Sequence, residues 1–257
     1  MRHSSAFRLI LALGLIATFF AGCSRDPNVQ KQKYLESGQR YFEKGKYREA
    51  EIQFRNAVKV DPQYAEAHYQ LAQTYLKLQQ WNRANQELGR TLELQPENYQ
   101  AHIDVANLLI AARQLKEAQE HTALLLLKQP NDPQVHVAVA NLLGAQGDFP
   151  GAVQEMQKAV ALGPERWESY MNLALLQMRL NQADAAEANF KKAVELNPKA
   201  MNAQLALGSY YQSRNRPAEA EQQFRHAIAT EPQNPDPRAA LTRLYMAEGK
   251  KTEAEEV

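Results

Sequence analysis

The apolar and small side chains of this chain recur with helical spacing. In residues 44–62, "KGKYREAEIQFRNAVKVDP", they return every three or four residues, and the stretch ends in Asp-Pro. This spacing places them on one face of an amphipathic helix. Proline cannot continue a helix and disfavours helical geometry in the residue before it. The pattern therefore predicts a helix that ends just before Pro62.

The same stop returns at a fixed interval along the chain. Prolines occur every 34 residues, at Pro62, Pro96, Pro130, Pro164, Pro198 and Pro232. Alanines keep the same interval, at Ala50, Ala84, Ala118, Ala152, Ala186, Ala220 and Ala254. A period of this length is typical of a helix–turn–helix unit. The repeats then cover 31–64, 65–98, 99–132, 133–166, 167–200 and 201–234, with a partial repeat at 235–257.

Each repeat is expected to fold as two packed helices, A and B, and residues are numbered below by their position in the repeat. Small residues at position 8, such as Gly38 and Ala72, let the two helices approach closely. A larger side chain there would overpack the contact, at a cost of about 1–3 kcal/mol. One helix pair cannot bury its own apolar face, so neighbouring pairs must stack. The sequence therefore predicts an all-α solenoid with a concave surface lined mainly by the A helices.

When the repeats are aligned, each position forms a column of residues, and these columns resemble those of the tetratricopeptide repeat (TPR) family over residues 31–257. Position 8 is Gly, Ala or Thr throughout, and positions 11 and 24 are mostly Tyr, Leu or Phe. The resemblance implies an α-solenoid with a right-handed superhelical course, here after an N-terminal signal segment. Three residues depart from the pattern: Thr122 and Gln177 are polar in apolar columns, and Leu125 replaces a small residue.

Residues 1–22 have the layout of an export signal. Arg2 and Arg8 precede an apolar run at Leu9–Phe20, and small residues follow it. A membrane span needs about 20 apolar residues, so the run favours a signal peptide over a transmembrane anchor. Residues 23–32 are polar and are expected to form a tether before the array at 33–257.

Cys23, the only cysteine of the chain, follows this segment, so no internal disulfide can form. "Phe20-Ala21-Gly22-Cys23" resembles a bacterial lipobox, although Phe20 stands where Leu is usual. The resemblance implies lipidation of Cys23, whose acyl chains would hold the protein on a membrane at about 0.8 kcal/mol per buried CH₂. Ser24 in place of Asp implies sorting to the periplasmic face of the outer membrane, or another envelope membrane. The alternative is an incidental Cys behind an ordinary signal.

Charge and motifs exclude several function classes. The formal charge is +1 and no basic face is evident, so nucleic acid is not an expected partner. No nucleophile elbow, HExxH or phosphate-binding loop is present. We therefore expect no enzyme activity, no cofactor and no small-molecule substrate.

Three histidines, His68, His102 and His136, share position 4 of their repeats. Successive hairpins lie about one helix diameter apart, roughly 10 Å. Ligands that share a zinc ion lie about 2.0–2.1 Å from it. The three rings are therefore expected to pack against neighbouring helices, and no metal site is predicted.

The resemblance implies that positions 2, 5, 9, 12 and 13 face the concave surface. Side-chain amides recur at position 9 and apolar residues at positions 5 and 12. Amides can donate to and accept from a peptide backbone, and apolar neighbours would hold alternate side chains of an extended segment. The candidate peptide groove comprises Tyr69, Gln73, Leu76, Ile103, Asn107, Ile110, Val137 and Asn141.

Two observations limit this groove hypothesis. An amide at position 9 is common in such repeats, so the amides could serve packing instead. The clamp that some TPR proteins use for C-terminal carboxylates needs Lys at position 5 and Asn at position 9 of one repeat. No repeat here pairs them, so capture of acidic chaperone tails is not expected.

Several functions fit this organisation. The leading hypothesis is a membrane-tethered scaffold that binds extended segments of other envelope proteins. It resembles lipidated TPR proteins of exosortase-type protein sorting and exopolysaccharide export. Alternatives are a pilotin-like assembly factor of type IV pili, the docking arm of a larger enzyme such as a glycosyltransferase, and a chaperone-like factor for outer-membrane proteins. The last repeat stops within helix B, which predicts either a continuation beyond Val257 or a short frayed cap.

Overall fold

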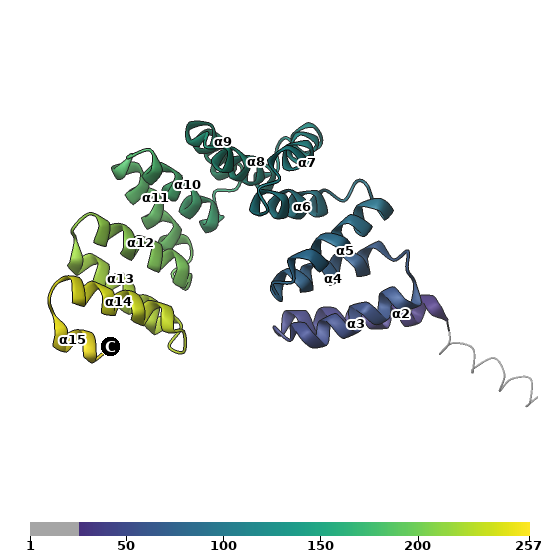
Figure 1. Ribbon diagram of the computed structural model, residues 1–257, viewed down its shortest axis with the longest axis horizontal. Helices are drawn as coiled ribbons and strands as arrows, with labels where there is room; N and C mark the ends of the chain where they lie inside the picture. Colours follow the sequence, from purple (N-terminus) through teal and green to yellow (C-terminus); the bar gives the residue numbers. More distant parts are fainter. Residues whose placement is uncertain (1–25) are drawn as a thin grey trace, which may run out of the picture. The chain divides into compact units, whose positions relative to one another are not determined.

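The computed structural model describes residues 26–257, which form fourteen helices and no strand (Figure 1). The A helices are α2 (Pro27–Glu43), α4 (Ala65–Lys77), α6 (Tyr99–Ala111), α8 (Pro133–Gln146), α10 (Trp167–Arg179), α12 (Met201–Ser213) and α14 (Pro235–Ala247). The B helices are α3 (Tyr47–Val60), α5 (Trp81–Leu94), α7 (Leu115–Lys128), α9 (Phe149–Leu162), α11 (Ala183–Leu196), α13 (Pro217–Thr230) and α15 (Lys251–Glu255). The predicted all-α solenoid of helix hairpins is confirmed. The predicted signal segment and Cys23 lie outside the described residues.

The helices follow the 34-residue period of the sequence. From Ala65 to Pro235, each A helix begins 34 residues after the previous one, and the B helices keep the same interval from Tyr47 to Lys251. Helix α3 ends at Val60, and Asp61 before the proline is extended, with φ −138° and ψ 99°. This is the geometry that a following proline imposes. The prolines therefore end the helices, as the sequence predicts.

The start of the first helix differs from the expected tether. Helix α2 begins at Pro27, so residues 27–32 are helical. Asp26 caps it by accepting a hydrogen bond from the Asn28 amide at 2.9 Å. Pro27 occupies the first turn, where its fixed φ suits a helix and no N–H is needed. Lys31 then bonds to Asp61 at 2.7 Å, which fastens the extra turn to the end of α3.

The chain divides into two compact units, and the boundary in the sequence falls between Leu108 and Leu109 within α6. In the first unit α3 packs against both α2 and α4, and α5 packs against α4. In the second unit each helix from α7 to α15 packs against the next, so that α9, α11 and α13 each lie between two A helices. The cores are centred on Phe54 and Leu71 in the first unit and on Phe190 and Phe224 in the second.

Small residues allow the close approach of helices in each hairpin. The alanines at position 20 are fully buried: Ala50, Ala84, Ala118, Ala152, Ala186 and Ala220. Gly208 on α12 faces Phe224 on α13, and a Cβ added at Gly208 would lie 2.5 Å from Cε1 of that ring. Contacts this short do not occur between real Cβ atoms and their neighbours. Glycine therefore makes room for the Phe224 ring at this crossing.

The turn from helix A to helix B has one geometry throughout. The residue at position 15 has positive φ in every repeat: Gly45, Gln79, Arg113, Gly147, Asn181, Asn215 and Gly249. Glycine and asparagine tolerate this left-handed conformation, whereas Gln79 and Arg113 carry some strain. The following amide closes the turn, as in Gln80, whose N–H donates to the Tyr75 carbonyl at 2.9 Å. Within residues 26–257, no helix combines the length and apolar character needed to cross a bilayer.

Candidate peptide-binding site

Two of the predicted groove residues, Tyr69 and Gln73, contact a carboxylate. Tyr69 and Gln73 lie one helical turn apart on α4, and Asp104 lies on α6. The Tyr69 hydroxyl donates to Asp104 Oδ2 at 3.1 Å, and the Gln73 amide donates to the same oxygen at 2.6 Å. The Gln73 amide is therefore engaged within the chain, and a peptide backbone would compete with Asp104 for it.

The surroundings of Asp104 shift the pKa of its carboxyl group. Burial raises the pKa of Asp104, against hydrogen bonds from Tyr69, Gln73 and Gln100 that lower it. Burial and the nearby Asp104 raise the pKa of the Tyr69 hydroxyl, so it remains a donor at neutral pH. Asp104 is not among the predicted groove residues. The signal was there, because Asp104 is the only Asp, Glu, Lys or Arg within Tyr99–Ala111.

The other predicted groove residues differ in exposure. Ile103 is only 5% exposed and so offers little surface to a partner. Leu76 is half-buried against the core of the first unit. Asn107 is exposed and makes a polar contact. In the second unit, Ile110 is half-buried. The groove as a whole stays a prediction.

The second unit has a hollow between α8 and α10, which contains the predicted residue Asn141. Val137 is half-buried one turn earlier on α8 and packs on the Ala140 cluster. The hollow has a volume of about 260 Å³. Its lining comes from three helices: Ala140, Asn141 and Gly144 of α8, Phe149 and Met156 of α9, and Asn172, Leu175, Leu176 and Arg179 of α10. We call it the Gly144 hollow.

The three position-4 histidines are buried and hydrogen-bonded. Each donates from Nε2 to the carbonyl of the preceding repeat's proline: His68 to Pro62 at 3.1 Å, His102 to Pro96 at 3.0 Å, and His136 to Pro130 at 2.8 Å. Nδ1 of His68 lies 2.5 Å from Glu87, and Nδ1 of His136 lies 2.7 Å from Glu155. Gln204 and Arg238 donate to prolines from the same position. Position 4 therefore fastens the hairpins of repeats 2, 3, 4, 6 and 7 to the end of the previous one.

The histidine contacts also affect proton binding. Burial lowers the pKa of His68, but the hydrogen bonds to Glu87 and Pro62 raise it by more. Both ring nitrogens face acceptors, so the protonated ring satisfies both contacts. Among residues 26–257, no group of three or more His, Cys, Asp and Glu side chains is arranged to hold a metal ion.

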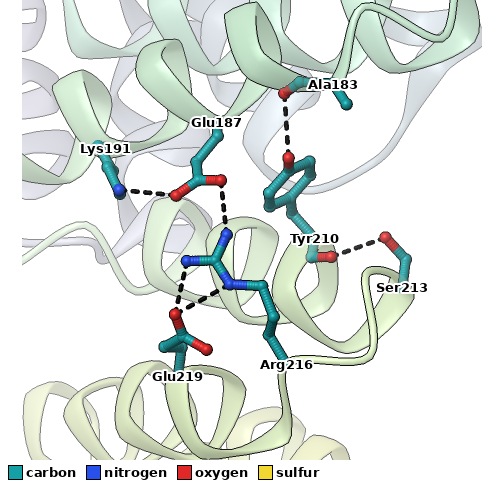
Figure 2. A network of polar contacts seen from close by, with 7 residues as sticks. All are labelled: Ala183, Glu187, Lys191, Tyr210, Ser213, Arg216 and Glu219. Atoms are coloured by element: carbon teal, nitrogen blue, oxygen red, sulfur yellow. Dashed lines mark hydrogen bonds and ion pairs between the residues drawn. The ribbon is translucent and has the colours of Figure 1, made fainter.

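A network of charged side chains links repeats 5 and 6. Figure 2 shows Arg216, in the turn before α13, between Glu187 of α11 and Glu219 of α13. Arg216 lies 2.6 Å from Glu187, which also pairs with Lys191 at 2.6 Å. The Arg216 contact is the main reason that the pKa of Glu187 is lowered. The guanidinium also stacks over the Tyr211 ring at 4.5 Å.

Models of known protein families match most of the sequence. Models described as "TPR repeat" and "Tetratricopeptide repeat" match residues 38–79, 79–142 and 211–257, and 138–200. Together these matches cover well over half of the 257-residue chain. The chain belongs to the tetratricopeptide repeat family. A comparison with curated proteins returns no match to this TPR protein.

Solved structures share its fold at low sequence identity. A tetratricopeptide repeat protein from Parabacteroides merdae superposes with a TM-score of 0.75 at 18% identity, with 90% of each chain covered. PilW, described as a widely conserved type IV pilus biogenesis factor, gives 0.68 at 18% identity, with 82% of this TPR protein and 98% of PilW covered. A chain of the APC/C heterotetramer Cut9-Hcn1 gives 0.73 at 18% identity. That superposition includes 86% of this TPR protein but only 44% of the APC/C chain.

Proposed function

We propose that this TPR protein is a non-catalytic scaffold that binds extended segments of other proteins on its A helices. The supporting observation is a set of large apolar side chains left exposed at positions 9 and 12. Leu175 and Met178 of α10 are 45% and 36% exposed, and Met246 of α14 is 56% exposed. We call positions 9 and 12 of α8, α10, α12 and α14 the helix-A face. Apolar surface next to polar groups is the usual composition of a peptide-binding surface.

Site-specific cross-linking tests this proposal. A photoreactive benzoyl-phenylalanine replaces Met178 on the helix-A face, or Ile52 of α3, which is 58% exposed on a B helix. We expect Met178 to cross-link to a distinct protein in cells and Ile52 not to. The captured protein is then purified, and its binding to the full chain is measured by calorimetry with Met178 and with Met178→Glu. Equal binding by both forms, or equal cross-linking from Ile52, contradicts the proposal.

We further propose that the scaffold is exported and lipid-anchored through Cys23, at the periplasmic face of the outer membrane or on another envelope membrane. The support is the signal layout before Cys23 and the polar Ser24 after it. Its partners would then be envelope proteins, in exopolysaccharide export or protein sorting. Cys23→Ser should move the protein from the membrane to the soluble fraction, with Ser24→Ala as the matched control. Unchanged membrane association of Cys23→Ser contradicts the anchor.

A second candidate is a pilotin-like assembly factor for type IV pili. The fold similarity to PilW, which spans 98% of PilW, favours this candidate. The two candidates predict different losses when the gene is deleted. Loss of surface pili with normal export of polysaccharide supports the pilus role, and the reverse supports the export role.

A further inference from the structure

We propose that the Gly144 hollow receives one large apolar side chain of a bound protein segment, and that an Asp or Glu next to that side chain pairs with Arg179. This inference rests on the proposed scaffold function and names the chemistry of the segment. It concerns the second unit alone, because every lining residue lies between Ala140 and Arg179.

Nothing in the fold requires glycine at position 144. Gly144 lies in the last turns of α8, and its φ is not positive, unlike that of Gly147 at the helix end. A Cβ added at Gly144 would meet Leu176 Cδ2 at 3.8 Å and Ala152 Cβ at 4.0 Å, which are ordinary contacts. Glycine within a helix costs about 0.5–1 kcal/mol relative to alanine. Gly144 therefore lowers the stability of helix α8, and no close contact within the described residues accounts for that loss.

The size and lining of the hollow fit one side chain. Position 12 carries Phe42, Leu76 and Met178 in other repeats, so Gly144 leaves out about one such side chain. The volume is about 260 Å³. An apolar cavity of about 150 Å³ can hold a benzene molecule. Phe149, Met156, Leu175 and Leu176 supply apolar walls, so a Leu, Met or Phe side chain would find both space and contacts.

Two polar side chains at the hollow have no partner among residues 26–257. Arg179 is exposed and is the only charged residue of the lining. In the described part of the chain it makes no ion pair, whereas Arg216 and Arg225 each pair with glutamates. The Asn172 amide likewise has no hydrogen bond within residues 26–257. A guanidinium in this state is suited to a carboxylate, to which it can bond with two parallel N–H groups.

The orientation of these groups favours a peptide over a small apolar molecule. Arg179 and Leu175 lie one turn apart on α10, so they face the same side of that helix. Asn172 lies one turn earlier on the same helix and offers two amide donors. Along α10 the order is Asn172, Leu175 and Arg179, which suits a backbone carbonyl, an apolar side chain and a carboxylate of one short Leu-Asp segment.

The test uses four decapeptides with Leu-Asp, Ala-Asp, Leu-Lys or Leu-Asn at the centre of a Gly-Ser background. Binding to the full chain is followed by NMR of methionine methyl groups labelled with ¹³C. Met156 lines the hollow and serves as the reporter, and Met246 of α14 reports on another part of the helix-A face. We expect Leu-Asp to shift the Met156 signal in a saturable way. Ala-Asp and Leu-Lys should bind roughly tenfold more weakly, since each lacks one of the two contacts.

Three variants test the assignment. Gly144→Leu fills the hollow and should abolish the Met156 shift, and leucine is a good helix former, so folding is preserved. Gly89→Leu is the matched control, because Gly89 is also a helical glycine with nothing within 4 Å of an added Cβ. It should bind Leu-Asp as the natural chain does. Arg179→Gln should bind Leu-Asp and Leu-Asn equally, which a merely structural role of Arg179 would not produce.

The outcomes separate this inference from the scaffold function. If Leu-Asp binds but Gly144→Leu binds it equally well, or Met246 shifts and Met156 does not, the hollow is not the site and the scaffold function stands. If none of the four peptides shifts Met156, the inference is wrong. The cross-linking from Met178 then decides the scaffold function by itself.

Discussion

The contact between Gly208 and Phe224 gives a stability prediction with a defined magnitude. An added Cβ at Gly208 would lie 2.5 Å from Phe224 Cε1 and 2.8 Å from Cδ1, and the Phe224 ring is fully buried. Overpacking of this kind costs about 1–3 kcal/mol. Alanine regains about 0.5–1 kcal/mol because it favours the helix more than glycine does. Gly208→Ala should therefore lower the free energy of unfolding by about 1 kcal/mol, and by no more than about 2.5 kcal/mol.

The chain supplies two controls for this substitution. Gly89→Ala adds the same methyl group where nothing lies within 4 Å, so it should raise the free energy of unfolding by about 0.5–1 kcal/mol. Repeat 2 pairs Ala72 with Leu88 at the two corresponding positions. The double variant Gly208→Ala, Phe224→Leu copies that pair. It should therefore lose less stability than the two single variants added together, with an interaction energy of about 0.5–2 kcal/mol.

Urea unfolding of the full chain, followed by far-UV circular dichroism, measures these differences. Repeat arrays can unfold in steps, so midpoints are compared together with slopes, and a changed slope marks a loss of cooperativity. If Gly208→Ala stabilises the protein as much as Gly89→Ala, the crossing of α12 and α13 is not tightly packed at Gly208. Strict additivity of the double variant would likewise show that the methyl group and the ring do not meet.

Three further predictions concern the charged groups. Because burial raises the pKa of Asp104, its contribution to stability is full below the unfolded pKa, near 4, and is lost as pH rises through the folded pKa. Urea unfolding at pH 4 and pH 7 should show a smaller loss of stability with rising pH for Asp104→Asn than for the natural chain. An unchanged pH dependence contradicts this prediction. The net pKa of His68 is raised, so its stabilisation is present below pH about 6.5 and is lost above the folded pKa. His68→Gln, which copies Gln204, should flatten that dependence between pH 5.5 and 8.5. Arg216→Met keeps the packing over Tyr211 but removes the ion pairs, so it should lower the urea midpoint more in low salt than in 0.5 M salt, and an equal loss in both would assign its effect to packing.

The fold was predictable because it depends on a period. Prolines and alanines repeated every 34 residues predict both the hairpins and where each B helix stops. The start of α2 was not predicted, because Asp26 and Pro27 form a local cap that has no counterpart in the period. The left-handed turn residue at position 15 is only partly visible in the sequence. Glycine or asparagine marks it in five repeats, but Gln79 and Arg113 give no sign of it.

The site was less predictable, because exposure depends on the size of neighbours in the next repeat. Column 5 suggests that Ile103 faces a partner, yet it is 5% exposed. Column 9 suggests that Gln73 is available, yet its amide is bound to Asp104. The Gly144 hollow exists because one side chain is missing on α8 while Leu175 on α10 stays 45% exposed. Neither residue alone indicates it in the sequence.

A polar clasp that joins repeats elsewhere in the chain is missing beside the hollow. In it, a Tyr at position 11 donates to a Glu at position 21 of the preceding repeat: Tyr75 to Glu51 at 3.4 Å and Tyr245 to Glu221 at 2.8 Å. Between repeats 4 and 5 these positions hold Val153 and Gln177, and the Gln177 side chain accepts a hydrogen bond from Asn189 in its own repeat at 2.8 Å.

Apolar contacts therefore replace that clasp between α9 and α10, through a cluster that includes Val153, Met156 and Leu173. Met156 belongs both to this cluster and to the lining of the Gly144 hollow. An apolar side chain bound in the hollow would contact α8 and α10 together and add packing across this junction, which has no polar clasp. Since a ligand that binds only the folded state stabilises it, binding there and the stability of this junction must be coupled.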